Sequence, residues 1–386
     1  MIKHEELEEK KWSNEKKMFL IETACDDLLS YGLWDGKTKI KNFIKKYLLL
    51  RQVGAEDVIF WPTGLLAVGI WQCRQRLLAM QKAGTAPAGS SFWLQQIETS
   101  LAAYFTRWEK RRYPIYYLDD LLSGEVFLAA YAQFHKDKTG NGIIQEKNAE
   151  KYRKAVEKMA EFAFSYPTDE TGSFPYRASQ GNGHIYVDVL GMTSPFLYSY
   201  ARFSGKDEGM ELGVRQIANF LAYGMDAATG LPYHGYNMKT GEKHGIIGWG
   251  RAVGWLLRGM MGCMSTVYGA ERLQEAYCDL IDAAIVWQRK DGFFSWQLQA
   301  MEGPADVSAT AMICLAIQEG LKTRMIQGDA YQEALAKGIH AIKKSVKYGR
   351  VDYCLGECEG FAMYPQKYGQ YPWGHAVTLL LDGIMN

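Results

Sequence analysis

Apolar residues recur through most of the chain at intervals of three and four, which is the spacing of one face of an α-helix. Alternation of apolar and polar positions, which would indicate strands, extends over only a few residues at a time. The pattern therefore predicts an all-α protein. Its principal helices are expected to begin at these positions: near Trp61 and at Asp119, Val187, Trp249, Ala305 and Pro372.

Short turns that combine glycine with aromatic residues separate the predicted helices. Four of these turns begin at Gly172, Gly230, Gly292 and Gly349, which are 58, 62 and 57 residues apart. A repeat of about 60 residues accommodates two helices and a long loop. Six such pairs fit the 386 residues. We therefore expect one (α/α)6-toroid domain over residues 1–386, with residues 1–15 as a polar arm or helix start and the starts of six helices around one mouth.

The clearest helix runs from Trp249 to Met261 and has two different faces. One face is apolar with helical spacing, as a packed helix requires, and includes Ala252, Val253, Leu256, Leu257, Met260 and Met264. The opposite face carries Arg251, Trp255 and Arg258. In one interpretation Arg251 binds the carboxylate of a sugar and Trp255 covers its apolar face. In the other, the helix is buried on both sides and Arg251 forms an internal ion pair.

Composition limits the classes of partner. The 44 basic and 43 acidic residues leave a net charge of +1, which gives no electrostatic reason to expect nucleic acid or a membrane surface as a partner. No apolar stretch approaches the roughly 18 residues of a membrane span. The odd number of cysteines, seven, in mostly apolar surroundings predicts a reduced, cytoplasmic setting. We expect a monomer or a homodimer.

Asp188 is the first candidate for chemistry, because it lies between apolar residues at the head of an expected helix. Desolvation there would raise the pKa of its carboxyl and suit it to act as a general acid. The alternative is an ordinary helix N-cap. Asp119 and Asp120 present the same choice: both are caps, or one faces a pocket beside Asp188, where the two charges would raise each other's pKa.

Motifs for metals and nucleotides are weak. Cys354 and Cys358 lack a second pair of ligands, and no HExxH spacing occurs. The glycine-rich stretches 181–183 and 245–250 lack the preceding strand of a phosphate-binding loop. We therefore expect no metal and no cofactor. His234 follows a Gly-Leu-Pro-Tyr turn on the expected rim, where a single histidine is more often structural than catalytic.

Several short motifs, taken in order, resemble the unsaturated rhamnogalacturonyl hydrolases of glycoside hydrolase family 105 and the related unsaturated glucuronyl hydrolases of family 88. The resemblance extends from about Trp61 to the C-terminus. The motifs that carry it are these: Leu118-Asp119 followed by Gly124, Tyr186 to Leu190 followed by Pro195-Phe196, Tyr233-His234-Gly235, and Trp249-Gly250-Arg251 followed by Gly254-Trp255.

The resemblance implies roles for individual residues. Asp188 matches the catalytic acid and base. Asp119 matches the second carboxylate, because its spacing to Gly124 fits the family pattern and that of Asp120 does not. Substrate contacts are implied for five further residues: His234, Trp249, Arg251, Trp255 and, on the pocket wall, Trp61. The loop from His234 to Trp249 is short for the family, which leaves the fine specificity open.

The implied substrate is a small oligosaccharide with a 4,5-unsaturated uronic acid at its non-reducing end. Hydration of the C4=C5 bond would release the linked sugar, with unsaturated galacturonyl-rhamnose as the first expectation. Three alternatives stay open. An unsaturated glucuronide from another polysaccharide would undergo the same chemistry. A sugar epimerase or isomerase would need two histidines rather than Asp188, and a non-enzymatic toroid would bind carbohydrate without turnover.

Overall fold

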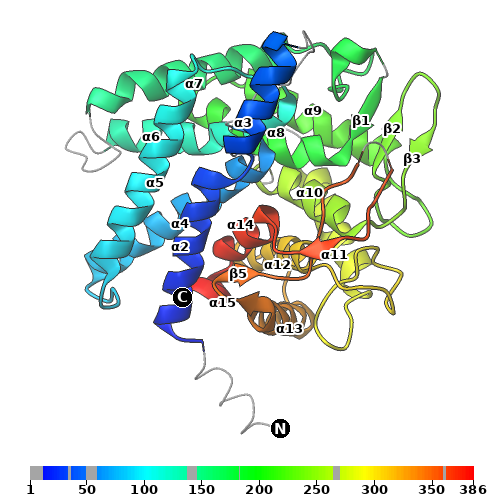
Figure 1. Cartoon of the computed structure of the whole chain (residues 1–386). Coiled ribbons are helices and arrows are strands. Elements are labelled where there is room, and N and C mark those ends of the chain that lie inside the picture. The colour runs from blue at the N-terminus through cyan, green and yellow to red at the C-terminus, as the bar shows by residue number, and fades with distance from the viewer. Residues whose placement is uncertain are drawn as a thin grey trace, which may run out of the picture.

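The computed structural model describes residues 12–33, 36–48, 59–136, 146–181, 183–263, 270–359 and 362–386. In this part of the chain, two concentric sets of helices alternate along the sequence (Figure 1). The inner set is α4 (Trp61–Ala83), α6 (Gly124–Lys136), α8 (Val187–Ser204), α10 (Gly250–Met261), α12 (Val307–Lys322) and α14 (Pro372–Leu380). The outer set is α2 (Asn14–Ser30), α5 (Ser90–Lys110), α7 (Glu146–Ser165), α9 (Glu208–Tyr223), α11 (Ala270–Ile285) and α13 (Asp329–Ser345).

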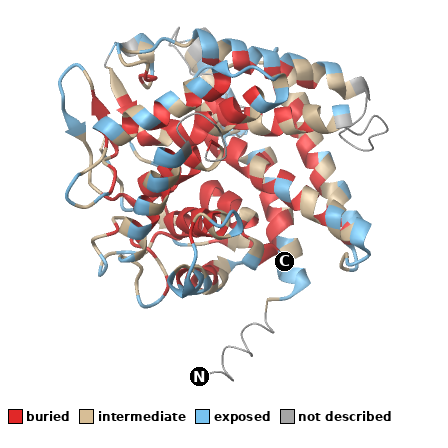
Figure 2. Cartoon of the chain, turned by 180° about the vertical axis from the view of Figure 1, so that it is seen from behind, coloured by how far each residue is buried: buried red, intermediate tan, exposed pale blue. Residues whose placement is uncertain are grey.

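The inner helices form a closed ring. Each packs against the next from α4 to α14, and α14 returns to pack against α4. Each outer helix packs on an inner one, so that only one of its faces is buried. The inner helices α10, α12 and α14 are instead buried on nearly all sides (Figure 2). The fold is therefore an (α/α)6 toroid, which confirms the architecture expected from the repeat.

The repeated glycines are structural parts of this architecture. Gly172, Gly230, Gly292 and Gly349 have φ angles of 81°, 69°, 88° and 71°. These values lie in the left-handed region, which glycine adopts at little cost. Each glycine follows an outer helix in the chain, at the turn that sends the backbone toward the next inner helix. The regular spacing in the sequence thus records one recurring turn.

Most predicted helix starts agree with the structure. α4, α8 and α14 begin at Trp61, Val187 and Pro372. Trp249 is the N-cap of α10, whose first residue is Gly250. The prediction at Ala305 was early by two residues, because the Asp306 side chain caps α12 by accepting a hydrogen bond from the Ser308 N–H at 2.9 Å. The expected N-terminal arm falls mostly on residues 1–11, and Met264 also lies outside the described residues.

The helix expected at Asp119 has a different start. The described chain first forms a 3-10 helix, η2 (Leu118–Ser123), and α6 begins only at Gly124. The Asp120 carboxylate accepts hydrogen bonds from the N–H groups of Tyr116 and Tyr117 at 2.8 and 3.1 Å. This cap tightens the first turn and fixes the direction in which the neighbouring Asp119 side chain leaves the backbone.

Short strands lie in the connections. β1 (His184–Tyr186), β2 (Gly235–Asn237) and β3 (Lys243–His244) form one antiparallel sheet. Two further pairs are β4 (Val346–Lys347) with β5 (Arg350–Val351), and β6 (Cys354–Leu355) with β7 (Tyr368–Gly369). The smaller helical segments are α3 (Gly36–Phe43), η1 (Ile44–Leu48), η3 (Ala178–Gln180) and α15 (Asp382–Met385). Among the described helices, none is both long and apolar enough to cross a membrane.

Candidate active site

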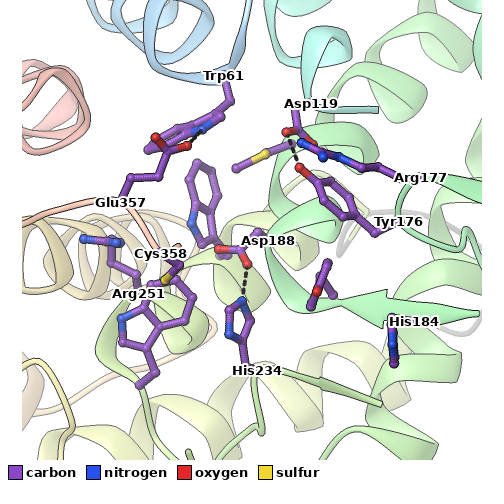
Figure 3. A pocket seen from close by; sticks show the side chains of 14 residues that line it. Trp61, Asp119, Tyr176, Arg177, His184, Asp188, His234, Arg251, Glu357 and Cys358 are labelled. Atoms are coloured by element: carbon purple, nitrogen blue, oxygen red, sulfur yellow. Dashed lines mark hydrogen bonds and ion pairs between the residues drawn. The ribbon is translucent and has the colours of Figure 1, made fainter. Parts of the chain in front are cut away.

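A cavity of about 450 Å³ opens at the starts of the inner helices. All of the residues predicted for the site line it (Figure 3): Trp61, Asp119, Asp188, His234, Trp249, Arg251 and Trp255. They lie in or next to the first two turns of α4, η2, α8 and α10, or in the segment before β2. The toroid brings these turns together because all of its inner helices begin on the same side of the ring.

Asp188 lies in the first turn of α8 but is not its cap. The N-cap is Tyr186, and it makes no side-chain capping hydrogen bond. The Asp188 Oδ2 atom is instead 2.9 Å from Nε2 of His234. The pairing of β1 with β2, together with the hydrogen bond from the Val187 N–H to the His234 carbonyl at 3.0 Å, holds this contact in place.

His234 connects Asp188 to a further residue. Its Nδ1 atom is 2.9 Å from the hydroxyl of Tyr364. When Nε2 donates to the carboxylate, Nδ1 of a neutral imidazole accepts the proton of that hydroxyl. The His234 side chain is only 4% exposed, whereas that of Asp188 is 20% exposed. The buried imidazole of His234 therefore fixes the Asp188 carboxyl by a hydrogen bond, and Asp188 lines the cavity.

The Asp119 carboxyl is strongly perturbed by its surroundings. Its Oδ2 atom accepts a hydrogen bond from the Tyr176 hydroxyl at 3.0 Å, and its buried Oδ1 atom has no partner among the described residues. Burial raises the pKa of Asp119 to about 7, and the charge of Asp188 adds to the rise, although Tyr176 and Arg177 oppose it. Asp119 therefore lines the cavity, whereas the Asp120 side chain caps the start of η2.

Arg251 has features of both the structural and the binding interpretation of its helix face. The side chain is 2% exposed, and its guanidinium donates to the carbonyls of Leu355 and Gly356 at 2.5 and 2.7 Å. It also lies 3.7 Å from the Asp306 carboxylate, which is the internal ion pair of the structural interpretation. The same guanidinium lines the cavity. Arg251 therefore fixes the segment after β6 and is available at the cavity wall.

Arg258, on the same face of α10, lies outside the cavity. Its Nη2 atom donates to both carboxylate oxygens of Glu125 of α6, at 2.8 and 2.9 Å, and its Nη1 atom donates to the Gly191 carbonyl of α8. Two arginines on one helix face thus differ in surroundings. Arg258 joins three inner helices, while Arg251 contacts a loop at the mouth.

Aromatic rings form much of the remaining wall. The rings of Trp61 and Trp255 meet edge to face, with centroids 6.0 Å apart and an interplanar angle of 83°. The Trp61 indole N–H donates to the Glu357 carboxylate at 3.0 Å. Trp249 lies beside His234, with ring centroids 4.7 Å apart. These indoles give the cavity apolar surfaces next to its carboxylates.

Sequence reasoning did not predict half of the lining: Tyr176, Arg177, His184, Tyr186, Met192, Glu357 and Cys358. Tyr176 follows the repeated turn at Gly172, which was a usable signal. Glu357 and Cys358 had none, because long-range contacts from Arg251, Trp61 and Trp373 bring their loop to the site. Burial raises the pKa of the Cys358 thiol to about 12. Among the described residues, no group of three or more His, Cys, Asp or Glu side chains is placed to hold a metal ion.

The chain matches the family model of Glycosyl Hydrolase Family 88 over residues 101–382. It belongs to this family. The matched part of this family 88 chain contains every site residue named above except Trp61, which confirms the family resemblance of the sequence motifs.

Relatives of this family 88 chain are distant in sequence. The unsaturated rhamnogalacturonyl hydrolase YesR of Bacillus subtilis (strain 168) is 24% identical over 255 residues, which cover 63% of this chain and 72% of that protein. The structure of a possible GH105 member from Salmonella enterica serovar Paratyphi A has a TM-score of 0.75 at 16% identity, covering 97% and 93% of the two chains. The unsaturated glucuronyl hydrolase of Bacillus sp. GL1 gives 0.68 at 15%, covering 97% and 98%. These two structures share the fold.

Proposed function

We propose that this family 88 protein hydrates the C4=C5 double bond of a 4,5-unsaturated uronic acid at the non-reducing end of an oligosaccharide and so releases the linked sugar. The observation that carries the proposal is the pair of carboxyls in one cavity with different surroundings. Asp188 is partly exposed and bonded to His234, and Asp119 is half-buried, with a buried Oδ1 atom and a pKa raised to about 7. The names of the relatives support the same chemistry.

The reaction begins at an electron-rich bond, because C4=C5 next to the ring oxygen is a vinyl ether. The Asp188 carboxyl transfers its proton to C4, which leaves a positive charge shared by C5 and the ring oxygen. A water molecule then adds at C5, and the Asp188 carboxylate takes the proton that this water loses. The hemiketal formed at C5 opens, and the linked sugar leaves. One carboxyl group serves as acid and then as base.

Asp119 has a different role in this scheme. Because its pKa is raised to about 7, it is mostly protonated below neutral pH and can donate a hydrogen bond to a substrate oxygen. Its Oδ1 atom has no protein partner among the described residues, which suits a contact with substrate. Asp119 therefore orients the sugar ring over Asp188. The carboxylate separation rule for ordinary glycosidases does not apply, since only one carboxyl transfers protons.

The cavity wall supplies the binding groups. Arg251 has guanidinium N–H groups beyond the two that bond Leu355 and Gly356, and these attract the uronate carboxylate. Trp61 and Trp255 cover the apolar face of the ring. We infer that the natural substrate is unsaturated galacturonyl-rhamnose, imported as the product of a polysaccharide lyase into the cytoplasm. The name of YesR supports the galacturonide, and the glucuronyl hydrolase fold keeps the glucuronide as the alternative.

The test follows the ultraviolet absorbance of the conjugated double bond, which hydration removes. Purified protein is mixed with a lyase digest of rhamnogalacturonan and, separately, with unsaturated glucuronides. Asp188→Asn should lower turnover by at least about 100-fold, the usual contribution of a general acid or base, while substrate binding persists. Asp207→Asn, an exposed carboxyl at the start of α9, is the matched control and should act as wild type.

Each outcome has a separate meaning. Decay on the rhamnogalacturonan digest alone supports the galacturonide, and decay on glucuronides alone moves the preference to them. Absence of decay on both substrates would contradict the hydration chemistry. Full activity of Asp188→Asn would reject its role as acid and base.

A further inference from the structure

A second cavity adjoins the candidate active site. Its volume is about 480 Å³, and its lining includes four aromatic residues, Tyr116, Tyr117, Phe162 and Tyr166. Arg177 lines both this cavity and the first one. The two hollows therefore meet at a single side chain. We call the second one the tyrosine groove.

Arg177 lies at the junction in a constrained conformation. Its φ angle of 54° lies in the left-handed region, which non-glycine residues rarely adopt outside functional or tightly determined positions. The guanidinium lies 4.8 Å from the centre of the Tyr117 ring and 5.4 Å from that of Tyr176. Tyr176 in turn donates to Asp119. Arg177 thus contacts Tyr117 of the groove and also Tyr176, and Figure 3 shows it beside the Tyr176–Asp119 pair.

The tyrosine rings form an open platform on a rigid support. Tyr116 is 50% exposed and Tyr117 is 37% exposed, with ring centroids 6.4 Å apart. Their backbone N–H groups are held by Asp120, within the same turn that positions Asp119. The floor is fixed as well, because the Tyr166 hydroxyl donates to the Pro175 carbonyl and accepts from the Ala178 N–H.

The chemistry of the groove fits a carbohydrate chain. A tyrosine presents an apolar face with a polar edge, which matches the apolar face and hydroxyl rim of a pyranose ring. Arginine supplies several hydrogen-bond donors and a positive charge for sugar oxygens or a uronate. A substrate that is cut at its non-reducing end must leave the first cavity at its reducing end, and the tyrosine groove shares the lining residue Arg177 with that cavity.

We propose that the tyrosine groove is a subsite for the reducing-end sugars of substrates longer than a disaccharide. The third or a later sugar stacks on Tyr116 or Tyr117, and Arg177 contacts the chain between the two cavities. This inference rests on the proposed function and deepens it, since it assigns unsaturated oligosaccharides of three or more sugars as the preferred substrate class.

The experiment compares an unsaturated disaccharide with an unsaturated tetrasaccharide from the same lyase digest. Values of kcat/KM are measured from the loss of absorbance for the wild type, Tyr116→Ala, Tyr117→Ala and Tyr117→Phe. The wild type should prefer the tetrasaccharide by about five- to tenfold, the range expected for one aromatic stacking contact. The two alanine variants should reduce or lose that preference and keep disaccharide turnover within about twofold, which follows if the groove is used only by the longer chain.

Two controls make the result specific. Tyr117→Phe keeps the ring and should retain the preference. Tyr348→Ala removes an 85% exposed tyrosine at the turn between β4 and β5 and should change neither substrate. Thermal unfolding of each variant verifies that it folds.

Three results would overturn the subsite. Equal kcat/KM for both substrates in the wild type would show that the groove binds no sugar. An equal loss on both substrates in Tyr117→Ala would mean that Tyr117 supports Asp119 instead. Turnover of neither substrate by the wild type would reject the proposed function and the subsite with it, whereas disaccharide turnover without a length preference rejects the subsite alone.

Discussion

Asp119 and Asp120 are neighbours in the chain and have different structural roles. Asp120 satisfies two backbone N–H groups, and Asp119 enters the cavity, where burial raises its pKa to about 7. The sequence led us to expect a raised pKa for a carboxyl that lies beside Asp188, and Asp119 shows this rise. The cause lies in its tertiary surroundings, because the Oδ1 atom of Asp119 is buried without a partner among the described residues and the carboxyl shares the cavity with the charge of Asp188.

The raised pKa has a consequence for stability. Between the ordinary pKa of about 3.9 and the folded value, the folded protein keeps a proton on Asp119 that the unfolded chain has lost. The free energy of unfolding therefore falls as the pH rises from about 4 to about 7, and this contribution is level above that range. Asp119→Asn, which does not titrate, should gain Tm relative to wild type as the pH rises from about 4 to about 7.

Thermal unfolding across this pH range measures the effect. Asp207→Asn, with its exposed side chain, should follow the wild type at every pH. A difference between Asp119→Asn and wild type that does not change with pH would mean that Asp119 ionises like an ordinary carboxyl.

Arg251 and Arg258 give a second contrast between residues. Arg258→Ala leaves Glu125 buried without its partner and should cost about 3–5 kcal/mol of stability with KM unchanged in the molecules that remain folded. Arg251→Ala should raise KM by an amount corresponding to about 2 kcal/mol, because it removes a charged donor from the cavity. Denaturant unfolding and initial rates measured on the same samples separate the two effects. An unchanged KM in Arg251→Ala would make that arginine purely structural.

At the scale of elements, close contact between inner helices depends on glycine. A Cβ atom on Gly191 of α8 would come within 2.6 Å of the ring and the carbonyl oxygen of Trp255 on α10. Gly259 of α10 faces the Leu190 carbonyl in the same way, at 3.0 Å. The two helices can therefore approach closely, which places Trp255 at the cavity wall beside the first turn of α8.

Gly191→Ala should separate α8 from α10. We expect a loss of about 1–3 kcal/mol, as for other overpacked cores, and a fall in kcat/KM because Trp255 moves. Gly36→Ala in α3 is the matched control, since its Cβ would meet nothing within 4 Å. Urea unfolding of both variants measures the difference. Equal free energies of unfolding for the two variants would show that α8 and α10 can accommodate the added methyl group without loss of stability.

At the scale of the whole molecule, ring closure joins the two ends of the chain. α14 packs against α4. The ring centroids of Trp373 and Trp61 are 4.8 Å apart, and the Trp373 indole N–H donates to the Leu355 carbonyl at 3.0 Å. The last inner helix thus supports the first one and the loop that carries Glu357. The site and the closure of the toroid share these contacts.

A chain truncated after Tyr371 lacks α14 and α15. It exposes the apolar face of α4 and leaves the ring open, so we expect loss of the cooperative thermal transition and of activity. Circular dichroism during heating tests this. A sharp transition at the wild-type Tm would show that the remaining hairpins fold independently of closure.

The sequence by itself determined the helical class and the repeat, and the family resemblance of its motifs implied the seven candidate site residues. Helical periodicity and glycine turns are local properties, and the site motifs lie at the starts of the inner helices, so a reading along the chain could find them. The all-α prediction missed only short strands such as β1 and β2, because two or three residues are too few for a periodic signal.

The tertiary structure alone decided which groups meet. Tyr364 reaches His234 across 130 residues, and Glu357 reaches Trp61 across 296. No local pattern encodes such contacts, because they depend on how strands pair and how the ring closes. The raised pKa of Asp119 was decided in the same way, since desolvation depends on every element that surrounds a carboxyl and not on its neighbours in sequence.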